Sequence, residues 1–250
     1  MDAYTHVDMN TADPLEDLRL QMASAGVSQA LVVETWDKSN YPCLRQIMMR
    51  PWAHLRGAFC FRPNEERPLR EQLENGSMAG VRVRTGDLLQ LGSLAEHLEA
   101  SGKWLLTYAE SGIGPLRDEL RKSLIRHPDL RIYVPHLGWP RRDGQDDPEW
   151  NTAMRELSSI PACIVGISAI AAFSKEPYPH ADVQEFAVRL HEFFGASRVI
   201  IGSNYPLFQR HMYSQYMFLA SQWRQSASAA TVTEFESKLF GNQENVERQP

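Results

Sequence analysis

The chain has 250 residues, of which 43% are hydrophobic and 23% are charged, an ordinary composition for a water-soluble domain with a sizeable core. A formal net charge of −5 argues against broad binding to nucleic acids or anionic membranes, because the densest basic pair, Arg141 and Arg142, is followed at once by aspartates. The three cysteines are widely spaced and form no Cys-x-x-Cys pair, which argues against a zinc knuckle or a disulfide framework.

Short apolar runs alternate with amphipathic stretches along the chain. The runs are rich in Val, Ile, Leu and Phe, as fully buried parallel strands are. They predict eight strands, at 2–7, 29–35, 56–61, 79–84, 103–109, 131–136, 162–168 and 198–203. Apolar residues at helical spacing between the runs predict helices, at 14–25, 113–126 and 181–194. Asp13 and Pro14 are typical of a helix start, and Gly26 and Gly195 of helix ends.

This alternation predicts an α/β fold, a (β/α)8 (TIM) barrel, as one domain over 1–250. An open doubly wound sheet is the alternative, but no Gly-x-Gly-x-x-Gly follows an early strand. In a barrel the active site lies at the carboxyl ends of the strands. Two polar loops, 139–150 and 169–181, follow the sixth and seventh strands and would lie on that face.

The sequence also bears on location and partners. No apolar run approaches the length of a membrane span, and the first residues show neither the basic start nor the apolar run of a signal peptide. We therefore expect a cytoplasmic enzyme or binding protein with a small-molecule partner and with neither membrane nor nucleic acid as a partner. Whether the chain forms a homo-oligomer is left open by the sequence.

Polar motifs stand where three of the predicted strands end. They are Asp-Ala-Tyr-Thr-His at 2–6, His-Leu-Gly-Trp-Pro at 136–140 and Gly-Ser-Asn-Tyr-Pro at 202–206. His6 and His136 hold equivalent places, and two histidines facing one lumen favour a functional role. Each could be a metal ligand, a general acid or base, or a satisfied core group.

Two arginines, Arg82 and Arg84, alternate with valines along the fourth strand, so both should point to one face. A buried cation without an anion is costly. The anion would be a substrate carboxylate held by a bidentate pair of hydrogen bonds, or an internal Asp or Glu. We expect a substrate carboxylate for at least one arginine. Glu110 and Glu34 end the fifth and second strands, where a carboxylate could shuttle a proton, bind a metal or lie in solvent.

In this order, the motifs resemble the amidohydrolase-related TIM-barrel family, in the branch of 2-pyrone-4,6-dicarboxylate lactonase and the sugar lactonases. That branch has Asp-x-His-x-His, Gly-hydrophobic-Arg, His-Leu-Gly-x-Pro and Gly-Ser-Asp-x-Pro on its first, fourth, sixth and eighth strands. The chain is similar at 2–6, 80–82, 136–140 and 202–206, and Ser168 lies in a stretch that looks like the family's seventh strand. The resemblance implies a hydrolase for a small carboxylated lactone or related ring compound.

The chain departs from the family at the centre of the expected site. Tyr4 replaces the first His, Asn204 replaces the Asp that activates water in relatives, and Tyr108 stands where many metal-dependent relatives carry a His. A neutral phenol is a poor zinc ligand, and a carboxamide cannot accept a proton as a carboxylate does. The resemblance therefore implies weakened metal binding and loss of the usual base.

Three functions stay open. The first is a metal-independent hydrolase, with catalytic residues His6, His136, Tyr4, Tyr108 and Asn204 and substrate-binding residues Arg82, Arg84, Glu110 and Ser168. The second is a barrel that has lost catalysis and binds a metabolite or a protein. The third is a metal-dependent hydrolase that holds Zn or Mn through an unusual ligand set, His6, His136 and Glu110.

Overall fold

The computed structural model describes all residues except 51, 53, 142–146, 208–211 and 226–250. Eight strands form one sheet in chain order, with every neighbouring pair parallel. They are β1 (Asp2–Thr5), β2 (Ala30–Val33), β3 (Leu55–Cys60), β4 (Met78–Arg84), β5 (Trp104–Tyr108), β6 (Arg131–Val134), β7 (Cys163–Ile167) and β8 (Val199–Ile201). The predicted fold class and all eight predicted strands are confirmed.

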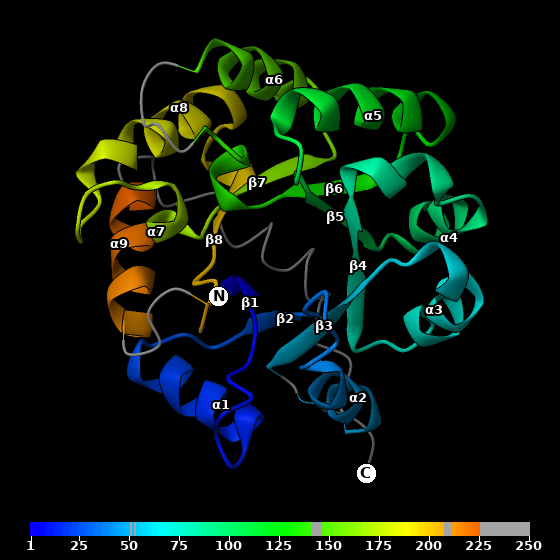
Figure 1. The fold of residues 1–250 in the computed structure, drawn as a ribbon, viewed down its shortest axis with the longest axis horizontal. Coiled ribbons are helices and arrows are strands. Elements are labelled where there is room, and N and C mark those ends of the chain that lie inside the picture. Colours follow the sequence, from blue (N-terminus) through cyan, green and yellow to red (C-terminus); the bar gives the residue numbers. More distant parts are fainter. Residues whose placement is uncertain (51, 53, 142–146, 208–211, 226–250) are drawn as a thin grey trace.

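A ring of helices surrounds the strands (Figure 1). The helices are α1 (Pro14–Ser24), α2 (Tyr41–Met49), α3 (Glu66–Leu73), α4 (Ser93–Ser101), α5 (Ile113–Arg126), α6 (Pro148–Ser158), α7 (Ile170–Phe173), α8 (Gln184–Phe194) and α9 (Tyr213–Gln225). The prediction for 113–126 agrees with α5, and that for 14–25 exceeds α1 by one residue. The third prediction divides into a short 3-10 turn, Ala181–Val183, followed by α8. Asp13 caps α1 as expected, since its side chain accepts the Glu16 N–H at 3.1 Å.

The buried residues form two layers. One large cluster joins the outward side chains of the strands to the helices, and includes Val81 and Val83 of β4. A second cluster contains strand residues only, at least one from each of the eight strands, including Tyr4, Trp104 and Tyr133. It fills the barrel interior, as side chains do in eight-stranded barrels. A ligand site therefore has to lie above this filled interior, at an end of the barrel.

Side chains join β1 to β8 and so bring together the two ends of the sheet. The Asp2 carboxylate accepts the Ser203 N–H at 2.9 Å and the Ser203 hydroxyl at 2.6 Å. The Asn204 N–H donates to the Tyr4 carbonyl at 2.9 Å. A Cβ at Gly202 would lie 2.9 Å from Tyr4 Cβ, so only glycine allows this close approach. The first and last sequence motifs thus meet directly.

The Asp2 contact should be a major source of stability. Asp2→Ala should lower the free energy of unfolding by about 3 kcal/mol, because it leaves the buried Ser203 N–H without its acceptor and the Ser203 hydroxyl with only Thr5 Oγ1, 3.2 Å away. Asp13→Ala, which removes only an exposed helix cap, should lower it by about 1 kcal/mol. Urea denaturation of both variants measures the two losses. Equal losses would show that this carboxylate does not hold β1 to β8.

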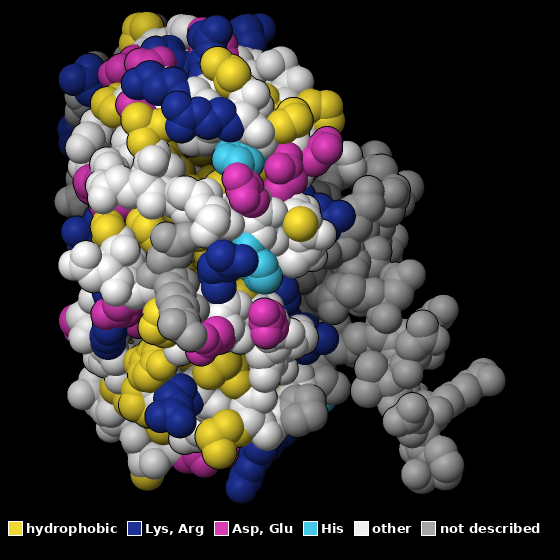
Figure 2. Space-filling view, turned by 90° about the vertical axis from the view of Figure 1, so that its right-hand side faces the viewer, with side chains coloured by type: hydrophobic (Ala, Val, Ile, Leu, Met, Phe, Trp, Pro, Cys, Tyr) yellow, Lys and Arg dark blue, Asp and Glu magenta, His cyan; other side chains and the backbone are white. Residues whose placement is uncertain are grey.

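Charged side chains of both signs are interspersed over the face displayed in Figure 2. Within the described ranges, no helix combines the length and the apolar character that crossing a membrane requires.

Candidate active site

A cavity of about 400 Å3 lies at the carboxyl ends of the strands. Its walls come from β4, from the last residue of β5, and from the segments that follow β1, β2, β6, β7 and β8. Five of the nine predicted site residues line it, namely His6, Arg82, Tyr108, His136 and Asn204. The sequence motifs therefore converge on one place, as the barrel requires.

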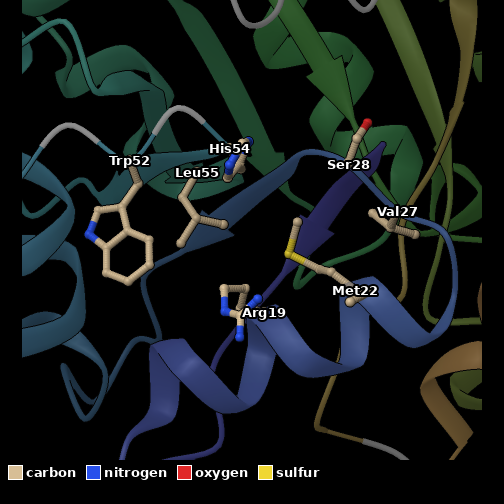
Figure 3. A pocket seen from close by; sticks show the side chains of 8 residues that line it. Arg19, Met22, Val27, Ser28, Trp52, His54 and Leu55 are labelled. Atoms are coloured by element: carbon tan, nitrogen blue, oxygen red, sulfur yellow. The ribbon is translucent and has the colours of Figure 1, made fainter.

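A second cavity, of about 230 Å3, lies near the opposite ends of the strands (Figure 3). It is lined by Met22 of α1 and by residues that precede β2 and β3, among them Val27 and Trp52. None of the predicted site residues contributes to it, so the candidate active site is the first cavity.

His6 lines the cavity, is almost fully buried, and has a side chain with one defined hydrogen bond. Its Nδ1 donates to the Val33 carbonyl at 2.6 Å, because a carbonyl oxygen can only accept. Its Nε2 is buried and has no partner among the described residues. Burial lowers the pKa of His6 to about 3, and the nearby Arg82 charge adds to this effect. His6 is therefore a neutral imidazole with an available acceptor.

His136 begins a 3-10 turn that follows β6 and the intervening Pro135. Its backbone N–H donates to the Ser168 hydroxyl oxygen at 3.0 Å, and its Nδ1 lies 2.9 Å from the same atom. Burial, the Arg82 charge and His6 together hold the pKa of His136 well below its ordinary value. Because Nδ1 is engaged, Nε2 is the ring nitrogen left for a ligand in the cavity.

Tyr4 packs against the two histidines and is fully buried. Its ring centroid is 5.5 Å from that of His6 and 4.4 Å from that of His136, both in edge-on contacts. Burial raises the pKa of its hydroxyl well above the usual value, and the Tyr4 oxygen has no hydrogen-bond partner in the described structure. Tyr4 is therefore a neutral support for the histidines and does not itself line the cavity.

The Arg82 guanidinium lies among three aromatic rings. Its Cζ is 4.6 Å from the ring centroid of Tyr108, 4.9 Å from Trp36 and 5.6 Å from Tyr4. Its side chain contacts the Glu34 carbonyl oxygen at 3.4 Å, and Arg82 forms no ion pair with a carboxylate in the part of the chain that the structure describes. The residue is only 6% exposed, so a buried positive charge lines the cavity.

Arg84 has the predicted orientation but a different environment. Its Cζ lies over the Trp36 ring at 4.4 Å, so it shares a face with Arg82, whereas Val81 and Val83 point outward. Arg84 is exposed, because β4 ends there and the side chain has passed the rim of the barrel. Only Arg82 is therefore enclosed.

Both carboxylates predicted near the site have other partners. Glu110 is exposed and accepts the N–H groups of Thr85 and Gly86 at 3.2 and 3.4 Å, outside the cavity. Glu34 is buried and accepts the Cys60 N–H at 2.6 Å, with Arg62 3.1 Å away. The structure thus does not bring Glu110 to the histidines, because the loops after β4 and β5 hold it.

Left-handed backbone conformations are concentrated around the cavity. Positive φ angles occur at His136, Trp139, Ala169 and Asn204, with values of 60°, 59°, 54° and 55°. Non-glycine residues adopt this region rarely, and it is often found at functional sites. The Asn204 Oδ1 is buried without a partner in the described part of the chain, so the site presents a further acceptor.

Sequence reasoning missed the aromatic wall. Trp36, Trp139 and Phe173 line the cavity, and the Trp139 ring lies 4.9 Å from Tyr108 and 4.9 Å from His136. The sequence could have indicated these residues, because all three lie in the segments that follow strands β2, β6 and β7, at the carboxyl ends of the barrel strands. Both predicted polar segments contribute to the cavity, 139–150 through Trp139 and 169–181 through Phe173, while 142–146 lies outside the described residues.

The donor set does not fit a divalent metal ion. No group of three or more His, Cys, Asp or Glu side chains is arranged to hold one in the described ranges. Tyr4 stands where a His ligand would be needed, and its raised pKa opposes a phenolate ligand. Arg82 places a positive charge beside both histidines. A zinc or manganese site built on His6, His136 and Glu110 is not assembled.

The low pKa of His6 has a measurable effect on stability. As pH falls from 7 to 5, the unfolded chain protonates a histidine of pKa near 6.5, while the folded chain, with a pKa of about 3, does not. The unfolded state then binds more protons, so the free energy of unfolding falls, by about 2 kcal/mol for this residue. His6→Gln should reduce the difference in unfolding free energy between pH 7 and pH 5 by that amount.

Urea denaturation at both pH values measures this difference, and His54→Gln at an exposed position is the control for losing an imidazole. An unchanged pH dependence in His6→Gln would contradict the buried neutral state.

Comparison with known proteins agrees with the motifs. Residues 113–228 match the family model described as Amidohydrolase. The L-fucono-1,5-lactonase of Burkholderia ambifaria is 33% identical over 85 residues, which span 33% of this chain and 28% of that protein. The matched stretch thus covers less than a third of that relative.

Two solved structures are similar over nearly the whole chain. A putative 2-pyrone-4,6-dicarboxylic acid hydrolase from Pseudomonas putida has a TM-score of 0.74 at 22% identity, covering 96% of both chains. A probable 2-pyrone-4,6-dicarboxylic acid hydrolase from Acinetobacter baumannii, with citric acid bound, has a TM-score of 0.74 at 16% identity, covering 96% of this chain and 98% of the other. At these identities the structures establish the fold. With the family match and the strand-end motifs, they confirm the expected resemblance: the chain is similar to the amidohydrolase-related TIM barrels of the lactonase branch.

Proposed function

We propose that this protein is a metal-independent hydrolase of a small carboxylated lactone or a related ring compound. The observation that carries the proposal is Arg82, a buried guanidinium in the cavity whose charge is not paired with a carboxylate in the described structure. An isolated buried cation is costly, so its partner is best sought in the ligand. A guanidinium matches the geometry of a carboxylate with two parallel hydrogen bonds.

The walls of the cavity favour a compact, flat substrate. Trp36, Tyr108, Trp139 and Phe173 surround a space of about 400 Å3, at the lower end of the range for small-molecule sites. Aromatic walls bury the ring of a substrate while the Arg82 charge orients its carboxylate. This arrangement would leave the ester carbonyl near the histidines.

Hydrolysis would proceed by addition of water to the lactone carbonyl carbon. A histidine Nε2 takes a proton from the water as the carbon–oxygen bond forms. The bond between the carbonyl carbon and the ring oxygen then breaks, and the ring oxygen receives that proton, which gives an open hydroxy acid. Arg82 lowers the pKa of both histidines, so a bound carboxylate that offsets its charge would make them stronger bases in the complex.

A second candidate function is ligand binding without turnover. Two observations favour it: Asn204, which cannot act as a base, stands in the position of the family's Asp, and His6 is a weak base in the free protein. Such a barrel would retain the Arg82 site and bind a carboxylated metabolite.

A panel of carboxylated lactones, each paired with its neutral methyl ester, separates these functions. The hydrolase should turn over a carboxylated member equally well with and without a chelator, and its ester poorly. Stabilisation of the protein by carboxylated members without turnover would support the binding function instead; a ligand at a hundred times its Kd adds about 2.7 kcal/mol. Activity lost with chelator would overturn metal independence.

A further inference from the structure

His6 and His136 differ in the partner of Nδ1, and this difference assigns them different roles. We propose that the two rings hold opposite tautomers, so that His6 presents an acceptor Nε2 and His136 presents a donor Nε2–H, with Ser168 as the residue that sets the second. The division of roles rests on the proposed hydrolase function, whereas the tautomers themselves do not.

The tautomer of His6 follows from its partner. The Val33 carbonyl has no hydrogen to give, so at 2.6 Å the hydrogen must be on His6 Nδ1. A neutral imidazole with a hydrogen on Nδ1 carries a lone pair on Nε2. Burial keeps this ring neutral, and no other hydrogen bond competes for Nε2 among the described residues.

The tautomer of His136 follows from the single hydrogen of Ser168. The Ser168 oxygen accepts the His136 backbone N–H at 3.0 Å, and His136 Nδ1 is 2.9 Å from the same oxygen. The backbone N–H uses one lone pair of that oxygen, and among the described residues the hydroxyl hydrogen has no hydrogen-bond acceptor other than His136 Nδ1, so it is directed to Nδ1. The neutral His136 ring then carries its hydrogen on Nε2.

Ser168 also fixes where the His136 ring can lie. Ser168 is 1% exposed and comes directly after β7, whereas His136 follows the neighbouring strand β6 with a φ of 60°. One hydroxyl thus binds both the backbone and the ring of a residue in an unfavourable conformation. Ser168 is therefore a positioning residue whose oxygen is engaged by His136, and its role in substrate binding stays a prediction.

Opposite tautomers suit the two demands of lactone hydrolysis. The His6 Nε2 lone pair takes the proton of the attacking water and returns it to the leaving ring oxygen. The His136 Nε2–H donates a hydrogen bond to the carbonyl oxygen as negative charge develops there, and it keeps its own proton throughout. A neutral imidazole held in place is a suitable electrophile for such an oxygen.

Nitrogen NMR of protein labelled with 15N-histidine tests the tautomers without any substrate. His6→Gln and His136→Gln assign the signals by their disappearance. We expect a protonated Nδ1 with a bare Nε2 for His6, and a bare Nδ1 with a protonated Nε2 for His136. The same tautomer in both rings would overturn the inference, whatever the activity of the protein.

Kinetics of Ser168 variants test the positioning role. Ser168→Ala should lower kcat by about tenfold to a hundredfold with little change in KM, since loss of a residue that orients a catalytic histidine has effects of this order or larger. Ser168→Thr, which keeps the hydroxyl, should retain most of the activity. Thr107→Val, which removes another buried hydroxyl bonded to the Tyr133 carbonyl, is the matched control.

An unchanged kcat in Ser168→Ala, or an equal loss in Thr107→Val, would overturn the positioning role. If no lactone is turned over at all, the proposed function fails, and the NMR result still decides the tautomers. A shift of the His136 Nδ1 signal in Ser168→Ala, without a shift for His6, would support the assignment independently.

Discussion

Arg82→Met should lower kcat/KM for a carboxylated lactone by about a thousandfold or more. The substitution leaves the substrate carboxylate desolvated without its guanidinium, and losing one partner of such a pair has an energetic effect of about 4 kcal/mol. The same variant should lose little activity toward the neutral methyl ester. Steady-state kinetics with both substrates measure the two effects.

Arg84→Met is the matched control, because Arg84 also stacks on Trp36 but is exposed at the rim. It should change kcat/KM by no more than about fivefold, as rim charges usually do. Arg82→Met should not lower the free energy of unfolding. The substitution removes a buried charge that has no ion-pair partner among the described residues. Equal losses with the acid and the ester, or a large loss of stability, would mean that Arg82 is a structural cation.

His136→Asn should lower kcat by about a thousandfold while the Kd of the substrate changes little. The imidazole acts on the carbonyl oxygen only as charge develops, so its removal affects the transition state more than the ground state. Single-turnover kinetics measure the chemical step, and calorimetry with a slowly hydrolysed analogue measures Kd.

The control for His136→Asn is His180→Asn, which removes another buried histidine, one bonded to the Glu176 carbonyl and the Tyr216 hydroxyl outside the cavity. It should affect stability but leave kcat within a few-fold of the wild type. A His136→Asn variant with unchanged kcat and weakened binding would assign His136 to ligand affinity alone.

The strands were readable from sequence because a fully buried parallel strand requires a continuous apolar run, and each run here ends at polar residues. The helix at 113–126 was equally clear, since its leucines repeat at helical spacing. The eighth strand was predicted too long, at 198–203. The Gly202 N–H still donates to the Ile167 carbonyl of β7, but Ser203 and Asn204 bond to Asp2 and Tyr4 instead.

The site was predictable only in part. His6, Arg82 and His136 could be placed because strand ends converge in a barrel and side chains alternate along a strand. The position of Glu110 could not be predicted, because the two backbone N–H groups that hold it belong to Thr85 and Gly86, which are distant from it in the sequence. The role of Ser168 depends on a contact between neighbouring strand ends 32 positions apart, which no local pattern reveals.

We propose that the two histidines and Arg82 act without a metal ion. The most direct test is elemental mass spectrometry of protein that is prepared without added metal and that turns over a lactone. The turnover of the same sample is measured before and after treatment with a chelator. We expect far less than one zinc or manganese ion per chain and a turnover that the chelator does not change. About one such ion per chain, whose removal abolishes turnover and whose return restores it, would contradict metal-independent hydrolysis.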